Sequence, residues 1–337
     1  MSKVTVVIPN YNGKKYLKPC MDSLMAQSFT DFSVIIVDNA STDESMDVLA
    51  EWMTEKGNKD WAASADTNDI PRVTCIRLNK NTGFSHAVNL GIGRAKGAYV
   101  FLLNNDTSVR RECLSELVRF MDSHENAFCA GAKMLMMSSP EYIDDCGDYY
   151  NALGYAYAAG KGKKSADYKA VREVFSACAG AALYRTGMLR RIGLFDENHF
   201  AYLEDVDVGY RARLHGLFSY IVPTGVVLHA GSAVSGSRHN AFKVRLSSRN
   251  SIYVIYKNQP LLQRLLNLPF IFAGILVKFL YFSKKGLGGV YVKGVAAGIR
   301  FCFTKEAGRH RVRFRPENMR YYVRIQLELW RNLFYMR

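Results

Sequence analysis

The sequence predicts an α/β fold with a mostly parallel central sheet, followed by a basic helical segment. In the first hundred residues, short β-branched runs alternate with helical periodicity, which is typical of a parallel sheet covered by helices. A hydrophobic content of 49% over 337 residues is ample for a full core, so a disordered chain is excluded. The third observation is that Lys and Arg gather in the last hundred residues.

Four apolar runs predict the strands of the sheet, in parallel order. They cover residues 4–8, 33–38, 73–78 and 99–103. Helical periodicity over residues 16–26 and 85–94 predicts two of the covering helices, and Ser41 or Thr42 can cap a third. In such sheets ligands bind beyond the carboxyl ends of the strands, so polar residues there are the first functional candidates.

The middle of the chain is less regular. Residues 61–71 have no pattern and predict a loop, and residues 142–169 mix Asp, Gly, Tyr and Lys without a period, which predicts an excursion over the surface. An apolar stretch over 175–183 and a helix over 185–192 follow. Pro260 and Pro269 are expected to break the basic segment into helical pieces.

The cysteines and the first residues bear on the compartment. Seven cysteines are scattered and form no CxxC pair, which favours a reduced cytosol. The first residues enter an apolar strand at once, without a charged region followed by a long apolar one. A secretory signal peptide is therefore not expected.

Polar residues cluster after three of the predicted strands. Residues 9–12 (PNYN) follow the first, residues 38–43 (DNASTD) the second and residues 104–106 (NND) the fourth. A carboxylate there can accept from a base or ribose, an aromatic ring can stack on a base, and an aspartate can bind a divalent cation. Singly, Asp38 can equally cap a helix and Tyr11 can equally be a packed loop aromatic. The spacing over successive strands indicates a common site.

Five segments carry a resemblance to a known family. They are VIPNYNG (7–13), VDNASTD (37–43), NTGFSHAVNLG (81–91), LLNNDT (102–107) and FAYLEDVDVGYR (200–211). In this order they resemble glycosyltransferase family 2, and its rhamnosyltransferase-like members most. The resemblance implies a GT-A fold over residues 1–237 and inverting sugar transfer from a nucleotide-sugar.

The resemblance also implies the donor-binding residues. Asp38 would hold a pyrimidine ring with Tyr11 beside it, and Gly83, which opens a helix, would let the main chain approach the ligand. The full nucleotide-sugar-binding set is Pro9, Tyr11, Asp38, Asn81, Gly83, Asn89, Asn105 and Glu204.

Residues 104–106 stand where the family keeps a metal-binding Asp-x-Asp. Asn104 replaces the first acid, so Asp106 carries the only charge and the donor diphosphate must supply further ligands for Mg²⁺ or Mn²⁺. His229 alone would be interpreted as a buried core histidine. The resemblance implies instead that it completes the metal site, as a second protein ligand, or touches the diphosphate.

Glu204, Asp205 and Asp207 place three carboxylates in four positions, and such mutually repelling groups rarely serve stability. One interpretation is a solvated helix start in which Asp207 pairs with Arg211, four residues on. The resemblance implies instead that Asp205 is the general base, which takes the proton of the acceptor hydroxyl. An inverting displacement needs no protein nucleophile.

Residues 238–337 form the predicted second unit, a basic amphipathic helical segment. It holds 20 Lys and Arg residues against three Glu. Residues 261–282 are apolar, but Arg264, Asn267, Pro269 and Lys278 interrupt them, whereas a membrane span needs about 20 apolar residues. A helix lying in the plane of an anionic membrane is therefore favoured over a span.

The leading hypothesis is a metal-dependent inverting glycosyltransferase, peripheral on the cytoplasmic face of a bacterial inner membrane. It would move L-rhamnose from dTDP-rhamnose to a lipid-linked or growing polysaccharide, and nucleic acid is not an expected partner. A nucleotidyltransferase is the enzyme alternative, although no Gly-rich loop with Arg or Lys follows the first strand. The non-enzyme alternative is a non-catalytic protein that binds the membrane surface. The replacement of an acid by Asn104 mildly supports this alternative.

Overall fold

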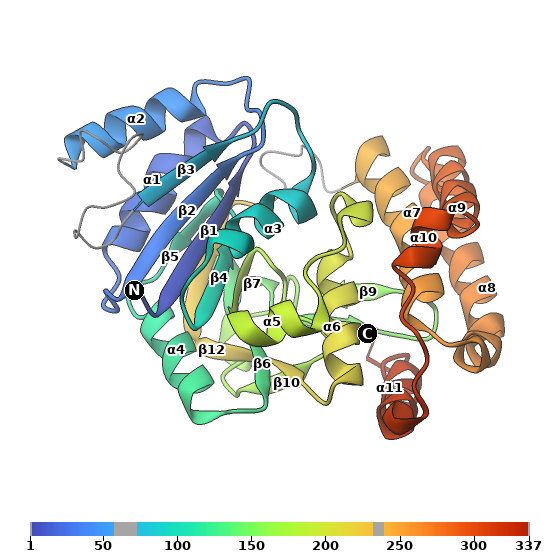
Figure 1. The fold of residues 1–337 in the computed structure, drawn as a ribbon. Helices are drawn as coiled ribbons and strands as arrows, with labels where there is room; N and C mark the ends of the chain where they lie inside the picture. Colours follow the sequence, from blue (N-terminus) through green and yellow to red (C-terminus); the bar gives the residue numbers. More distant parts are fainter. Residues whose placement is uncertain (1, 57–72, 232–238, 336–337) are drawn as a thin grey trace.

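The computed structural model describes residues 2–56, 73–231 and 239–335, with a ten-stranded mixed sheet at its centre (Figure 1). The strands of this sheet are β1 (Val4–Asn10), β2 (Phe32–Asp38), β3 (Val73–Arg77), β4 (Tyr99–Leu103), β5 (Thr107–Val109), β6 (Ala127–Met136), β7 (Ser139–Asp145), β10 (Arg172–Val174), β11 (Ala181–Arg185) and β12 (Phe218–His229). Their order is β10-β12-β6-β11-β4-β1-β2-β3, with β5 beside β12 and β7 beside β6. A separate two-stranded sheet joins β8 (Asp148–Tyr150) and β9 (Ala156–Ala158).

The four predicted strands are β1 to β4, and all of them are parallel. β1 pairs with β2 on one side and β4 on the other, and β2 pairs with β3. In this register Asn10 lies opposite Asp38, so the ends of β1 and β2 share one edge of the sheet. The strand β11 runs antiparallel between β4 and β6, which makes the sheet mixed.

Helices cover both faces of the sheet because the strands are apolar on both sides. Val4, Val6 and Ile8 of β1 pack in one core with α1, α2 and α4, whereas Val7 packs in a second core with α3, α5 and α6. The helices are α1 (Lys14–Met25), α2 (Ser45–Glu55), α3 (Phe84–Arg94), α4 (Cys113–Ser123), α5 (Thr186–Ile192), α6 (Glu204–Leu214), α7 (Ala241–Asn258), α8 (Leu261–Ser283), α9 (Gly288–Cys302), α10 (Lys305–Arg309) and α11 (Met319–Arg331). Such alternation of side chains along each strand produces the layered α/β architecture.

Two predictions about irregular regions were wrong. Residues 142–169 are no surface excursion, because β7 pairs with β6 and Ile143 and Tyr150 are fully buried. β8 and β9 are only three residues long, and β7 holds Pro140 and three acids, so none of them gives a periodic apolar signal. Pro260 does precede a helix, as predicted, but Pro269 lies inside α8 and the helix continues past it to Ser283. Proline costs a helix one backbone N–H, and here that loss does not end the helix. The loop predicted over residues 61–71 lies outside the described residues.

The C-terminal helices pack onto the sheet domain through a third apolar core. In it, Phe175 and Tyr210 of the domain meet Val254 of α7 and Leu329 of α11. Figure 1 shows α7 to α11 gathered on one side of the domain, next to α6. The predicted boundary between residues 237 and 238 lies at a segment that the structure does not describe and stays a prediction.

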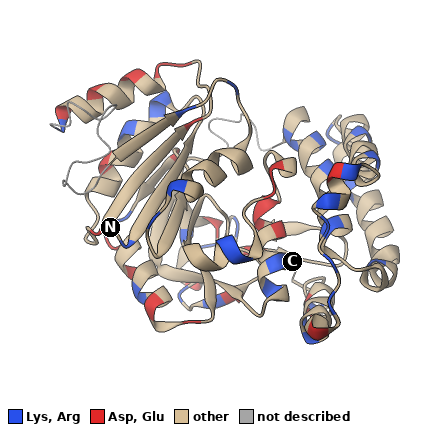
Figure 2. Ribbon diagram, in the orientation of Figure 1, with Lys and Arg blue, Asp and Glu red and all other residues tan. Residues whose placement is uncertain are grey.

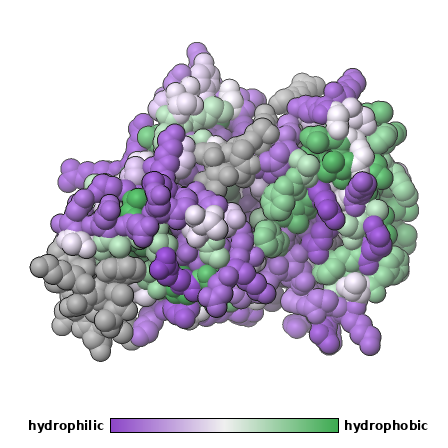
Figure 3. All heavy atoms as spheres, turned by 90° about the horizontal axis from the view of Figure 1, so that it is seen from above, coloured by the Kyte–Doolittle hydropathy of each residue, from purple (hydrophilic) through white to green (hydrophobic). Residues whose placement is uncertain are grey.

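Helix α8 has the reverse polarity of a helix in a water-soluble protein. The residues it buries are Gln263, Asn267 and Gly274. Gln263 accepts a hydrogen bond from Tyr210, and Asn267 exchanges two hydrogen bonds with Gln326 of α11. The large apolar residues that α8 exposes are Leu261, Leu262, Leu265, Leu266, Leu268, Phe272, Leu276, Val277, Phe279, Leu280 and Tyr281. Seen from above, apolar residues gather on the side of the molecule that the C-terminal helices form (Figure 3).

Candidate functional site

Asn10 joins the ends of the parallel strands into one hydrogen-bonded group. Its amide nitrogen donates to Oδ1 of Asp38 at 3.0 Å, and its oxygen accepts from the amide of Asn105 at 2.7 Å. All three side chains are buried. The structure therefore brings together Asp38 and Asn105, which the sequence placed on separate strand ends. The sequence placed Asn10 in the polar cluster after the first strand but assigned it no role, although its alternation with Val6 and Ile8 pointed it to the buried side of β1.

The turn before α3 is tied to the end of β2. Oδ1 of Asn39 accepts from the backbone N–H of Thr82 at 2.8 Å, and the Asn39 amide donates to the carbonyl of Gly83 at 3.0 Å. Asn81 accepts from the N–H of Gly83 at 3.0 Å. Gly83 has a φ of 86°, and a Cβ there would lie 2.5 Å from the carbonyl oxygen of Phe200. Only glycine allows this close approach to the loop before α6.

The remaining predicted donor residues lie in different surroundings. Tyr11, beyond the end of β1, is 39% exposed, so its ring is open to a base, and Pro9 stands opposite Val37 in the sheet. Asn89 is used within the protein, since its amide donates to the carbonyl of Phe195 and its oxygen accepts from the N–H of that residue. Donor contacts of all these residues stay predictions.

Asp106 and His229 meet at the edge of the sheet because β5 pairs with the end of β12. Nε2 of His229 lies 3.3 Å from Oδ1 of Asp106, and Nδ1 lies 2.6 Å from Oδ2 of Asp144. Burial alone would lower the pKa of His229, but hydrogen bonds to the two carboxylates outweigh it and raise this pKa to about 9. Asp144, which also contacts Lys161, has its pKa lowered to about 2.

These residues fit a divalent cation that has further ligands from outside the protein. The Asp106 carboxylate and Nε2 of His229, once the metal displaces its proton, offer one oxygen and one nitrogen side by side. The second ring nitrogen is held by a carboxylate, as is usual for a metal-bound histidine. Within the described residues, no group of three His, Cys, Asp or Glu side chains could hold a metal. Oxygens of a bound diphosphate would have to complete the coordination.

The three carboxylates of α6 have three different environments, so they are not a solvated helix start. Asp207 is fully buried and pairs with Arg211 at 2.9 Å and Lys257 at 2.9 Å. These cations hold its pKa far below the usual range, despite burial. Glu204 is also buried, and among the described residues none donates a hydrogen bond to its Oε2. Burial and the neighbouring Asp205 raise the pKa of Glu204 to about 8.

The pKa of Asp205 lies between those of Asp207 and Glu204. Its side chain is half-buried, and its Oδ1 accepts from the backbone N–H of Val206 at 2.8 Å. Burial raises its pKa to about 6, although backbone N–H groups act in the opposite direction. A carboxylate with this pKa is ionised at neutral pH and basic enough to accept a proton.

Two further acids, Asp145 and Asp148, interact electrostatically with Asp205, and sequence reasoning missed them. Burial raises the pKa of Asp145 to about 6, and burial with the charges of Asp205 and Asp145 raises the pKa of Asp148 well above its usual value. Asp148 accepts from the hydroxyl of Ser176 at 3.0 Å. The only signal was the acid-rich run at 144–148, inside a stretch without periodicity.

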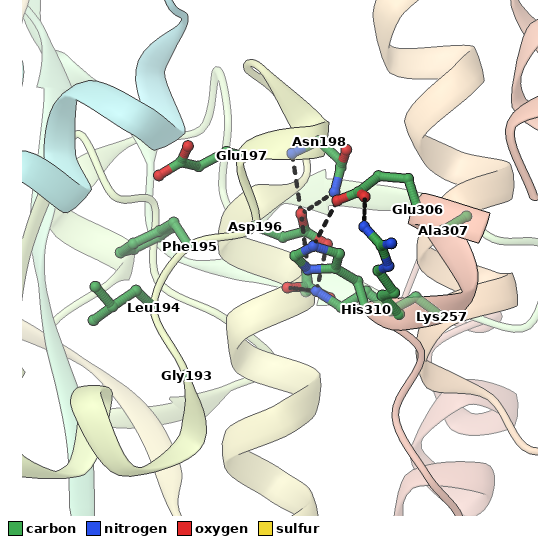
Figure 4. A network of polar contacts seen from close by, with 12 residues as sticks. Gly193, Leu194, Phe195, Asp196, Glu197, Asn198, Lys257, Glu306, Ala307 and His310 are labelled. Carbon is green, nitrogen blue, oxygen red and sulfur yellow. Dashed lines mark hydrogen bonds and ion pairs between the residues drawn. The ribbon is translucent and has the colours of Figure 1, made fainter. Parts of the chain in front are cut away.

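Polar contacts fix the loop before α6 to the C-terminal helices (Figure 4). Oδ2 of Asp196 accepts from Tyr253 and from Lys257, both at 2.7 Å, and His310 lies 3.6 Å from the other oxygen. The ammonium of Lys257 outweighs burial and lowers the pKa of Asp196 to about 2. Because Lys257 also binds Asp207, one lysine of α7 connects this loop to α6.

The sequence has relatives among known proteins. The family model described as Glycosyl transferase family 2 matches residues 5–193. A putative teichuronic acid biosynthesis glycosyltransferase, TuaG of Bacillus subtilis, is 29% identical over 141 residues, or 42% of this chain and 50% of TuaG. The poly(ribitol-phosphate) beta-N-acetylglucosaminyltransferase TarS of Staphylococcus aureus is 27% identical over 128 residues, or 37% of this chain and 20% of TarS. The matches thus span half or less of these two relatives.

Solved structures share the fold. S. aureus TarS 1–349 in complex with UDP-GlcNAc superposes with a TM-score of 0.58 at 17% identity, over 97% of this chain and 89% of that one. GalNAc-T7 with UDP, GalNAc and Mn²⁺ gives a TM-score of 0.59 at 15% identity, over 76% of this chain and 48% of that one. The predicted GT-A fold, with a mostly parallel sheet and C-terminal helices, is confirmed.

Proposed function

This chain belongs to glycosyl transferase family 2, and we propose that it moves a sugar, with inversion, from a nucleotide-sugar to a hydroxyl of a lipid-linked or growing cell-surface polysaccharide. The observation that carries the proposal is Asp205, a half-buried carboxylate with a pKa of about 6 at the start of α6. The loop before it touches the turn at Gly83, which supports a general base close to the proposed nucleotide site.

In the proposed reaction Asp205 accepts the proton of the acceptor hydroxyl as its oxygen attacks the anomeric carbon. The bond from that carbon to the phosphate oxygen of the nucleotide breaks on the opposite face, and the diphosphate leaves. Asp38 and the exposed ring of Tyr11 would hold the base. Asp106 and His229 would hold Mg²⁺ or Mn²⁺, which supplies positive charge to the leaving diphosphate when bound.

L-Rhamnose from dTDP-rhamnose is the donor that we propose first, because the five motifs resemble the rhamnosyltransferase-like members most. UDP-N-acetylglucosamine is the competing donor, since TarS, which has the same fold, binds it. The test is a panel of nucleotide-sugars with and without divalent metal, read as release of nucleoside diphosphate. Release from one donor only assigns that donor. A parallel assay offers a nucleoside triphosphate with a sugar 1-phosphate, and pyrophosphate release there would indicate a nucleotidyltransferase. Turnover in neither assay would indicate a non-catalytic protein.

We propose further that the protein docks peripherally on the anionic cytoplasmic face of the inner membrane. Helix α8 is 23 residues long with a hydropathy of 1.9, and within the described chain it is the one helix long and apolar enough to cross a membrane by these criteria. Gln263 of this helix binds Tyr210 of α6 and Asn267 binds Gln326 of α11, and a span would take these amides from their partners. Lys and Arg residues lie along α10 and the segment after it (Figure 2). Those of them that are exposed include Arg309, Arg311, Arg313, Arg315 and Arg320.

Co-sedimentation with vesicles tests this docking. The full chain should bind vesicles that contain phosphatidylglycerol, bind neutral vesicles weakly, and leave the anionic ones at high salt, which screens the arginines. Binding in the cell that resists both salt and alkaline wash would indicate a span instead. Removal of the chain from Pro260 onward is unsuitable, because it would uncover the core that α11 shares with α6.

A further inference from the structure

The backbone between residues 199 and 203, just before α6, adopts a rare conformation. Phe200, Tyr202 and Leu203 have φ values of 62°, 71° and 69°, and none of them is glycine. Such residues adopt positive φ only where the surrounding structure holds them, and they concentrate at functional sites. This strained loop (199–203) must therefore be fixed from outside.

Asn250 of α7 supplies that fixation. Its amide nitrogen lies 2.9 Å from each of three carbonyl oxygens, those of His199, Ala201 and Tyr202. The amide has two N–H groups, so the three carbonyls share them. The side chain is fully buried, and its own oxygen accepts from Arg249 at 2.7 Å. Arg249 donates to the carbonyl of Asn198 as well, at 2.6 Å.

The strained loop connects the two halves of the candidate site. On one side the carbonyl of Phe200 accepts from the backbone N–H of Ser85 at 3.2 Å, next to Gly83. On the other side the carbonyl of Leu203 accepts from the N–H of Asp207 at 3.0 Å, in the first turn of α6. The position of Asp205 relative to the nucleotide-side turn is thus set by the conformation of residues 199–203.

We propose that Asn250 is a positioning residue for the transfer reaction: it holds the strained loop so that Asp205 faces a donor bound at the turn of residues 81–83. This inference rests on the proposed function. It also means that the C-terminal segment, besides any contact with a membrane, takes part in building the site. An error of about 1 Å in the placement of a reacting group can cost about 100-fold in rate, so loss of this fixation should lower kcat strongly.

The test compares Asn250→Ala with Asn267→Ala. Asn267 is an equally buried asparagine of the same C-terminal segment, but it bonds to Gln326 and Trp330, in α11, and not to the strained loop. We expect Asn250→Ala to lower kcat by about 10- to 100-fold while the Kd for the nucleoside diphosphate product of the assigned donor stays within about threefold. Asn267→Ala should keep kcat within about threefold, even where both variants lose similar Tm.

Hydrogen–deuterium exchange gives a readout that does not depend on turnover. Amides of residues 200–207 should exchange faster in Asn250→Ala and unchanged in Asn267→Ala. If Asn250→Ala does not fold, Arg249→Gln removes the bonds to Asn198 and to the Asn250 oxygen and should give the same pattern more weakly. Equal loss of kcat in both asparagine variants, or unchanged exchange, overturns the proposal. A wild-type chain that turns over no nucleotide-sugar overturns the proposed function instead, and the exchange result still decides whether Asn250 holds the loop.

Discussion

The ammonium of Lys257 lies 2.9 Å from Oδ2 of Asp207, and both side chains are almost fully inaccessible to water. This contact joins the first C-terminal helix to the helix that carries the candidate base. It also separates the roles of two acids that the sequence places two positions apart, because Asp207 is neutralised by cations and Asp205 is not.

Asp207→Asn should act on stability. It leaves Arg211 buried without its carboxylate and Lys257 with Asp196 as its one remaining acidic partner among the described residues. Breaking a buried ion pair from one side typically costs about 3–5 kcal/mol. Urea denaturation followed by circular dichroism measures the loss. The exposed pair of Arg309 and Glu306 is the control, since Glu306→Gln should change stability by less than about 1 kcal/mol. A variant as stable as the wild type would contradict the buried pairing.

Asp205→Asn should act on rate. Loss of a general base typically lowers turnover by about 10² to 10⁴, and the isosteric amide should leave nucleotide affinity unchanged. Initial rates at saturating donor, with calorimetry of nucleotide binding, separate the two quantities. If Glu204→Gln cripples turnover and Asp205→Asn does not, the base has been assigned to the wrong carboxylate.

Glu204→Gln should be more stable than the wild type, and this difference in stability should grow as pH rises. The pKa of Glu204 is about 8 in the folded chain and about 4.5 when the residue is exposed, so the folded state keeps a proton that the unfolded state has lost. The wild type therefore loses stability as pH rises between these values, and the neutral amide does not. The gain in Tm should be larger at about pH 8 than at about pH 5, while Glu125→Gln, on the surface, should show no such trend.

Asp106→Asn tests the metal site. Mutating a residue that only hydrogen-bonds to a metal ligand typically lowers metal affinity by about 10- to 100-fold. Loss of a direct ligand should therefore lower metal-supported turnover by at least about 100-fold. Titration of Mn²⁺ into the chain with nucleoside diphosphate, alongside the rate, gives the measurement. Asp122→Asn, whose carboxylate bonds to Lys3 and Tyr99, is the matched control. Turnover of Asp106→Asn close to the wild-type rate would remove Asp106 from the site.

The exposed face of α8 gives a further prediction. Leu265 and Leu276 are 56% and 57% exposed, so changing both to Gln should alter Tm little. Full burial of a leucine contributes about 1.5–3 kcal/mol, and just over half of each of these side chains is exposed. The double variant should therefore bind anionic vesicles about 10- to 300-fold more weakly. Val171→Gln, at 49% exposed on the sheet domain, should bind as the wild type does.

The sequence predicted the parallel half of the fold because each of those strands is a local apolar run. For β4 the prediction over 99–103 agrees with the structure residue for residue. The antiparallel strand β11 between β4 and β6 depends on pairing between distant segments, which no local pattern encodes. The strands of residues 139–158 were missed for a different reason, since two of them are only three residues long and the third is mostly polar. Asp145 and Asp148 were missed with them.

Within the site, the motifs placed residues at strand ends but could not say which of them use their polar groups inside the protein. Asn89 is bound to Phe195, and Asp207 to Lys257. Asp205 was singled out through the family resemblance, since three adjacent acids are equivalent in a sequence. Asp207 differs from the other two because Arg211 and Lys257 pair with it, and Lys257 comes from α7, which begins more than 30 residues further along the chain.

The polarity of α8 also bears on which substitutions the helix will tolerate. A lipid surface has no fixed shape, so leucine, isoleucine, phenylalanine and methionine should replace one another freely at the exposed positions. Asn267 and Gln263 have partners of defined geometry and should tolerate almost no exchange. A saturation scan of this helix would therefore give a reversed profile, in which the polar residues are invariant and the large apolar ones vary among themselves.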